Sequence, residues 1–126
     1  MPPNHAQRYP LAAYLHGNLA WAALHEERAD TALVHIDEAL SRLADEPSIV
    51  RAFLLEIKHY ALAMQNKPLA WDVCMTELET LLDHIEAAHE EGVEGARESA
   101  RYWSEREDEP RASRARALEA RLSKAF

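Results

Sequence analysis

The sequence is poor in cysteine and in residues that interrupt helices. Its 126 residues include one cysteine, 3 glycines and 6 prolines. A single cysteine excludes a disulfide within the chain, and the apolar neighbours Val73 and Met75 predict that the Cys74 thiol is buried as a small hydrophobe. No apolar run approaches the roughly 18 residues of a membrane-spanning helix. We therefore expect a cytoplasmic protein that makes no membrane contact.

Motifs of catalysis are also missing from the sequence. The glycines Gly17, Gly92 and Gly95 do not form a phosphate-binding loop, and no nucleophile motif of a hydrolase occurs. A cysteine inside an apolar stripe lacks the exposed, electropositive setting of a reactive thiol. The sequence therefore predicts a protein that is not an enzyme and needs no cofactor.

The charge is acidic overall and unevenly distributed. The formal net charge is -8, with 6 Lys/Arg against 15 Asp/Glu in residues 1–92 and 8 against 7 in residues 93–126. An acidic surface repels phosphate, so nucleic-acid binding is not expected over most of the chain. The arginines of the last segment could contact an acidic ligand, or they could form a solvated face that neighbouring glutamates balance.

Abundant Ala, Leu, Glu and Arg predict an all-α fold. The spacing of Leu11, Leu15 and Leu19 predicts a first helix whose leucine face enters the core. Asp30 is expected to cap the second helix, and Pro47 with Ser48 to end it and begin the third.

Proline also marks the start of the fourth predicted helix, because Pro68 suits a first helical turn. This helix is expected to run to about Glu91 and to end at Gly92. Two narrower apolar stripes predict helices that begin near Val93 and Asp108. About six helices would form one domain, residues 1–126, of three antiparallel hairpins at about 10–45, 47–91 and 93–125.

An alanine recurs near the start of the second helix in each hairpin. These second helices are expected to start at Asp30, Pro68 and Pro110, so the starts are 38 and then 42 residues apart. An alanine stands two residues after each start, at Ala32, Ala70 and Ala112. A small residue near a hairpin turn lets two helices approach closely. We therefore expect Ala70 to be buried at such a contact, with Trp71 entering the core.

The segment "NLAWAALHEERADTALVHIDEALSRLADEP" has an order of small and large residues that resembles the tetratricopeptide-repeat family. The second hairpin departs from the family pattern at Lys58 and Glu77, no glycine stands at the hairpin turns, and both spacings exceed the usual repeat of about 34 residues. The resemblance implies a superhelix of stacked hairpins, and an ordinary helical bundle is the alternative. The matching residues are Leu19, Ala20, Ala23, Ala32, Ile36, Ala39 and Pro47, then Ile57, Ala61 and Ala70, then Ala100 and Ala112.

The resemblance also implies a function and a site. In that family the first helix of each hairpin lines a groove that holds a peptide, so the chain would be a non-enzymatic adaptor or regulatory module that binds a peptide or protein. An apolar floor ending in two arginines would suit a ligand with apolar anchors and an acidic group. The expected partner-binding residues are Tyr14, Trp21, His25, Leu55, His59, Arg97 and Arg101.

Two Glu-x-x-His pairs support an alternative. Glu56 with His59, and Glu86 with His89, have the spacing that places a carboxylate and an imidazole on one helix face, as metal-binding bundles require. If the fourth helix continues to residue 91, the pairs lie about 15 Å apart along the hairpin, too far to share a metal. We therefore expect no metal centre shared by the two pairs. The second hypothesis for the protein is a self-associating bundle with a His/Glu metal or small-ligand site.

Overall fold

The part of the chain that this computed structural model describes, residues 3–43, 48–86 and 89–126, contains six α-helices and no strand. The predicted all-α fold is confirmed. None of these helices combines the length and the hydropathy that a membrane span requires. The helices are α1 (Pro3–His25), α2 (Ala29–Arg42), α3 (Ile49–Met64), α4 (Pro68–Leu82), α5 (Glu90–Glu105) and α6 (Glu109–Ser123).

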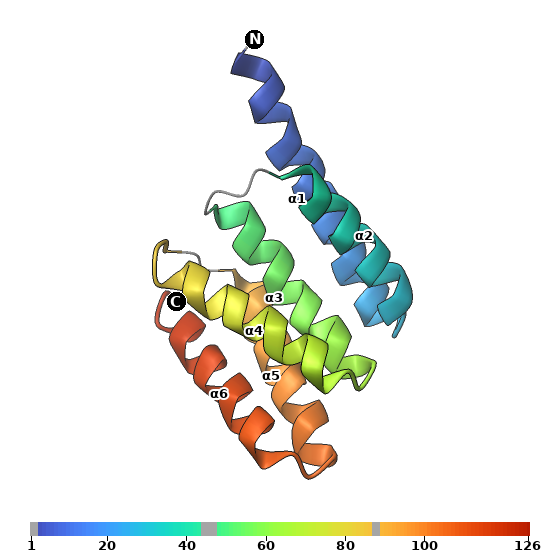
Figure 1. Cartoon of the computed structure of the whole chain (residues 1–126), viewed down its shortest axis with the longest axis vertical. Helices are drawn as coiled ribbons and strands as arrows, with labels where there is room; N and C mark the ends of the chain where they lie inside the picture. Colours follow the sequence, from blue (N-terminus) through green and yellow to red (C-terminus); the bar gives the residue numbers. More distant parts are fainter. Residues whose placement is uncertain (1–2, 44–47, 87–88) are drawn as a thin grey trace.

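The helices are paired in sequence order. α1 packs against α2, α3 against α4 and α5 against α6, and the three hairpins follow one another through the molecule with their turns at the same end (Figure 1). α3 also contacts α1, α2 and α5, so it is the central helix. Its side chains are buried on nearly every face, including those of Glu56 and His59.

Two of the residues predicted to start helices are confirmed, and one predicted cap is wrong. The Ser48 side chain accepts a hydrogen bond from the backbone N–H of Arg51 at 3.1 Å, so the predicted cap of the third helix is confirmed. Pro68 occupies the first turn of α4 as expected. Asp30 was wrongly predicted as a cap, because α2 already begins at Ala29. Pro47 lies outside the described residues.

The three hairpin turns share one backbone geometry. Glu27, Asn66 and Glu107 have φ values of 59°, 56° and 60°, in the left-handed region that usually favours glycine. The backbone N–H of the following residue donates to the carbonyl five residues earlier, at 2.8, 3.0 and 2.8 Å. The chain therefore adopts the same helix-ending turn three times without glycine, with two glutamates and an asparagine at the left-handed positions.

This geometry corrects the predicted alignment of the second hairpin. Counting from the left-handed residues, the equivalent positions are Ala32, Trp71 and Ala112, all of which are fully buried. Ala70 was predicted at the close contact, but it is exposed. The second hairpin thus carries a tryptophan where the first and third carry alanine, and the large ring fills space between α4 and the helices beneath it.

The predicted core face of the first helix is also wrong. Leu11, Leu15 and Leu19 are each more than half exposed. The buried face instead carries small residues, which allow close packing: a Cβ atom on Gly17 would lie 2.5 Å from Cε2 of Phe53. Within residues 11–25 of α1, the small buried residues are Ala13, Gly17, Ala20 and Ala23.

The boundary between the second and third hairpins differs from the prediction as well. α4 ends at Leu82 rather than near residue 91, and α5 begins at Glu90. Gly92, predicted to end a helix, lies in the first turn of α5. A Cβ atom at this position would lie 2.7 Å from the carboxyl carbon of Glu56, so the glycine is needed for the close approach of α3 and α5.

Candidate partner-binding surface

A groove of about 400 Å³ lies between α2 and α4, with α3 beneath it. Its floor is apolar and includes Leu55 and Leu62 of α3 and Leu33 of α2. Ala70, Val73 and Cys74 form the α4 wall. We call this feature the α2–α4 groove.

Apolar side chains are exposed on both helices that border the groove. Val73 lines it and is 69% exposed, and Leu69, one turn earlier on the same face of α4, is 76% exposed. On α2, Val34 follows the groove residue Leu33 and is 69% exposed. An apolar groove with exposed apolar edges has the anatomy of the central part of a protein interface.

A second cleft, of about 710 Å³, adjoins the groove across α4. Val73 and Glu77 line both, so the two form one surface that α4 divides. Its lining combines the apolar side chains of Val73 and Leu81 with Thr76, Thr80 and His84. We call it the α4 cleft.

Charges in the groove are largely compensated within the chain. Lys58 lies 3.1 Å from Asp37, and this pair joins α3 to α2. Glu77 lies 3.3 Å from Arg51, and this pair joins α4 to α3. Lys67, at the turn end of the groove, has no carboxylate partner among the described residues. The apolar centre is thus framed by ion pairs and ends at one available ammonium group.

The single cysteine faces the groove from a buried position. The Cys74 Sγ atom lies 3.5 Å from the carbonyl oxygen of Leu55, and burial raises the pKa of the thiol to about 12. The predicted burial of this residue is confirmed. A thiol with so high a pKa is protonated at neutral pH and is a poor nucleophile.

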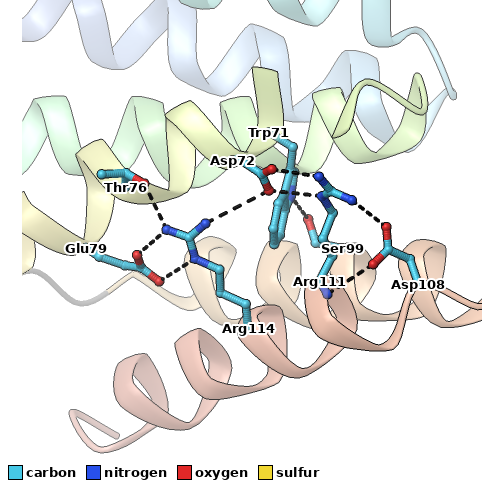
Figure 2. A network of polar contacts seen from close by, with 8 residues as sticks. All are labelled: Trp71, Asp72, Thr76, Glu79, Ser99, Asp108, Arg111 and Arg114. Atoms are coloured by element: carbon cyan, nitrogen blue, oxygen red, sulfur yellow. Dashed lines mark hydrogen bonds and ion pairs between the residues drawn. The ribbon is translucent and has the colours of Figure 1, made fainter. Parts of the chain in front are cut away.

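Ion pairs between α4 and α6 fix the position of α4, the shared wall of both clefts (Figure 2). Arg111 binds both carboxylate oxygens of Asp72, at 3.0 and 2.7 Å, and also Asp108 at 2.7 Å. Arg114 donates to Glu79 from Nε at 3.0 Å. Such two-pronged arginine–carboxylate contacts are geometrically specific, so they hold α6 and α4 in one register.

The other arginines of the last segment also have partners within the chain. Arg97, Arg101, Arg116 and Arg121 contact glutamates or an aspartate. Arg106 instead donates to the backbone carbonyls of Ala63 and Met64. The carboxylate contacts compensate four of the charges on which a phosphate-binding role of this segment would depend.

The residues predicted to bind a partner do not form one surface. Leu55 is in the floor of the α2–α4 groove, whereas His59 is fully buried in the core. Tyr14 is partly exposed on α1, and its ring packs against Phe53 with centroids 5.2 Å apart. Arg97 is exposed and pairs with Glu119 of α6 at 2.8 Å.

The remaining predicted residues belong to a row of rings on α1, α3 and α5. The ring of Trp21 lies 4.9 Å from that of His25 and 5.8 Å from that of Tyr60. Tyr60 lies 6.4 Å from Tyr102, whose ring has the Arg101 guanidinium 4.6 Å from its centroid. The prediction missed Tyr60 and Tyr102, which connect the outer members of the row.

The arginine expected to bind an acidic ligand already has acidic partners. Arg101 lies 2.7 Å from Glu98 and 3.0 Å from Glu105. A ligand carboxylate would have to displace these contacts. The spacing of Glu98, Arg101 and Glu105, three and four residues apart, is the signal in the sequence that could have revealed this pairing.

The two Glu-x-x-His pairs do not act as pairs: Glu56 and His59 have different partners, and Glu86 is exposed. The predicted separation of about 15 Å is wrong, because α4 ends at Leu82 and the chain brings Nδ1 of His89 to 3.1 Å from Oε2 of Glu56. His59 instead contacts the Ser99 hydroxyl at 2.8 Å, and burial lowers the pKa of this histidine to about 3. Among the described residues, no three His, Cys, Asp or Glu side chains converge on a point where they could hold a metal ion.

No protein-family model matches this chain, and comparisons with curated proteins and with solved structures give no match either.

Proposed function

We propose that the protein is a non-enzymatic interaction module that binds a segment of another protein in the α2–α4 groove. The observation that carries the proposal is the exposure of Val34, Leu69 and Val73 beside an apolar groove. Full burial of one such side chain contributes about 1.5 to 3 kcal/mol. Three of them, covered by one partner, would supply a substantial part of a micromolar affinity, which needs about 8 kcal/mol.

The groove favours a particular kind of partner. A helix with apolar residues at every third or fourth position could place them between Leu33 and Val73, as in other helix-in-groove complexes. An acidic residue at one end of that helix would meet Lys67, the ammonium group that lacks a partner within the described chain. We therefore propose an amphipathic helix with an acidic end as the preferred ligand.

We propose a tetratricopeptide-like stack of hairpins whose binding site differs in position from that of the family. Three hairpins with identical turns, and a central α3 packed on both neighbours, support such a stack. In the family, the first helix of each hairpin lines the groove. Here the cleft lies between two second helices, and of the residues expected to bind, Leu55 alone lines it.

Selection from a displayed library of amphipathic helices would test the proposal, and it does not require the natural partner. Peptides enriched on the wild-type protein should bind at least about tenfold more weakly to Val73→Glu, since a charge would be buried in the apolar contact. The matched control is the double variant Arg97→Ala/Arg101→Ala, which alters the alternative face and should leave binding unchanged. Enriched peptides that bind Val73→Glu normally would refute the groove as the site.

A second candidate function, self-association, has its own observation. Leu11, Leu15 and Leu19 form an exposed ridge along α1, and the start of this helix projects beyond the rest of the molecule in Figure 1. Exposed apolar ridges of this kind commonly mark sites of association. Light scattering across a concentration series should show association of the wild type that Leu15→Glu abolishes and Val73→Glu preserves. A wild type that stays monomeric at about 1 mM, where even weak association is detectable, would exclude this candidate.

A further inference from the structure

A buried carboxylate lies where the three hairpins meet. Glu56 of α3 is fully buried, and its Oε2 atom lies 3.1 Å from Nδ1 of His89, which directly precedes α5. Its other carboxylate oxygen, Oε1, is buried and has no hydrogen-bond partner among the described residues. Within that part of the chain, the imidazole is thus the side chain that compensates this carboxylate, and the contact joins the second hairpin to the third.

The start of α5 is built around the carboxylate. Gly92 leaves the space that the carboxyl group fills, since a Cβ atom there would lie 2.7 Å from Oε2. Gly95, one turn later, brings the backbone of α5 close to that of Glu56: a Cβ atom at Gly95 would lie 3.2 Å from the Glu56 carbonyl oxygen. Displacing the Glu56 carboxylate would therefore disturb the docking of the first turns of α5.

The other groups around the pair make loss of its proton costly. Tyr14 of α1 contributes a ring whose centroid lies 6.4 Å from that of His89, and Phe53 of α3 contributes an apolar ring at 5.0 Å. Glu91 of α5 adds a second negative charge and raises the pKa of both Glu56 and His89. The pair is therefore surrounded by the apolar ring of Phe53, the phenol of Tyr14 and the carboxylate of Glu91. Among the described groups that shift the pKa of either residue, no cation besides His89 could compensate Glu56.

We propose that Glu56 and His89 form a proton-dependent latch that holds α5 against α3 and loosens when the pair loses its proton. With the proton present, the imidazole and the carboxyl group satisfy one another. Without it, a buried carboxylate faces a neutral ring and Glu91. Buried unpaired charges are strongly unfavourable, so the first turns of α5 should open toward water.

The direction of the pH effect follows from both groups. Burial raises the pKa of Glu56, and the hydrogen bond to the Glu56 carboxylate raises the pKa of His89. A group whose pKa is raised by folding stabilises the folded state below its ordinary pKa and loses this effect as the pH rises through the folded value. The latch is therefore closed below about pH 6.5, the ordinary value for histidine, and opens as the pH rises above it.

Amide hydrogen exchange at about pH 6 and about pH 8.5, corrected for the intrinsic rates, tests the latch. Protection of the first two turns of α5 should fall by about tenfold or more at the higher pH, because a buried carboxylate that has lost its counter-charge strongly disfavours the docked helix. Protection of the amides in α2 should not fall between the two pH values. In Glu56→Gln this pH dependence should disappear, and in the control His84→Asn, an exposed histidine of the same connecting segment, it should remain.

A direct titration keeps the proposal testable if Glu56→Gln folds poorly. The His89 ring resonances should titrate above pH 6.5 in the wild type, and His89→Gln, which replaces a partly exposed ring, should also lose the pH dependence of exchange. Equal pH dependence in the wild type and His89→Gln would overturn the latch. So would a His89 that titrates at or below its ordinary pKa.

Discussion

Replacing Gly92 with alanine should destabilise the protein, although alanine is the better helix former. In an exposed helix the change would stabilise by about 1 kcal/mol. Here the new methyl group would lie 2.7 Å from the Glu56 carboxyl carbon, inside van der Waals contact. The carboxylate must then move, which adds an overpacking cost of about 1 to 3 kcal/mol and weakens a charge-assisted hydrogen bond worth about 1.5 to 3 kcal/mol.

The net loss should be about 1.5 to 5 kcal/mol after the helix gain is subtracted. For a chain of this size that corresponds to a fall in Tm of about 6 to 20 °C, measured by circular dichroism or calorimetry. Glu94→Ala, an exposed substitution on the same helix, is the control and should change the Tm little. A Gly92→Ala protein as stable as the wild type would refute the close packing of α3 and α5 around Glu56.

Three further predictions address other parts of the fold. Arg111→Lys should cost about 1 kcal/mol of unfolding free energy in urea titrations, because lysine cannot hold both oxygens of Asp72, and an unchanged midpoint would contradict this. Cys74 should react with a thiol reagent only after unfolding, and rapid labelling of the native protein would show that the thiol is accessible. Ala32→Leu should cost about 1 to 3 kcal/mol by overpacking, whereas Ala70→Leu should be nearly neutral. Equal effects of the two alanine substitutions would refute the alignment of the hairpin turns.

The all-α fold and most helix starts could be predicted from the sequence because they depend on local chemistry. The serine at position 48 and the proline at position 68 act within one turn of the chain. The glycine at position 92 shows where local reasoning fails. It resembles a helix end, but its role is to make room for a carboxylate that is 36 residues away in sequence. Such a role is invisible without the tertiary contact.

The face of α1 was mistaken for a related reason. Hydrophobicity favours burial of the leucine ridge, but close packing against α3 selects the small residues, because Gly17 accommodates the ring of Phe53. The pattern Ala13, Gly17, Ala20 was a signal for this face that apolar periodicity alone overlooked. A predicted face made of large residues can therefore be the surface, where it is available to a partner.

The candidate site was predictable only in part. Leu55 was expected from its place on the third helix, but the groove depends on the separation of α2 and α4, which no local pattern specifies. The pairing of Arg97 with Glu119 likewise depends on how α5 meets α6. Side-chain chemistry in the sequence indicated which residues could bind, and the packing of the hairpins decided which of them face a cleft.

The central claim, that α2 and α4 bind a partner helix, is tested most directly by mapping a selected peptide onto the protein. Amide chemical shifts in NMR spectra should change along the α2–α4 groove, around Leu33, Ala70 and Val73. Trp21 and Tyr102, in the row of rings on α1 and α5, should be unaffected. Shift changes that are confined to α1 and α5, with none in the groove, would contradict the account.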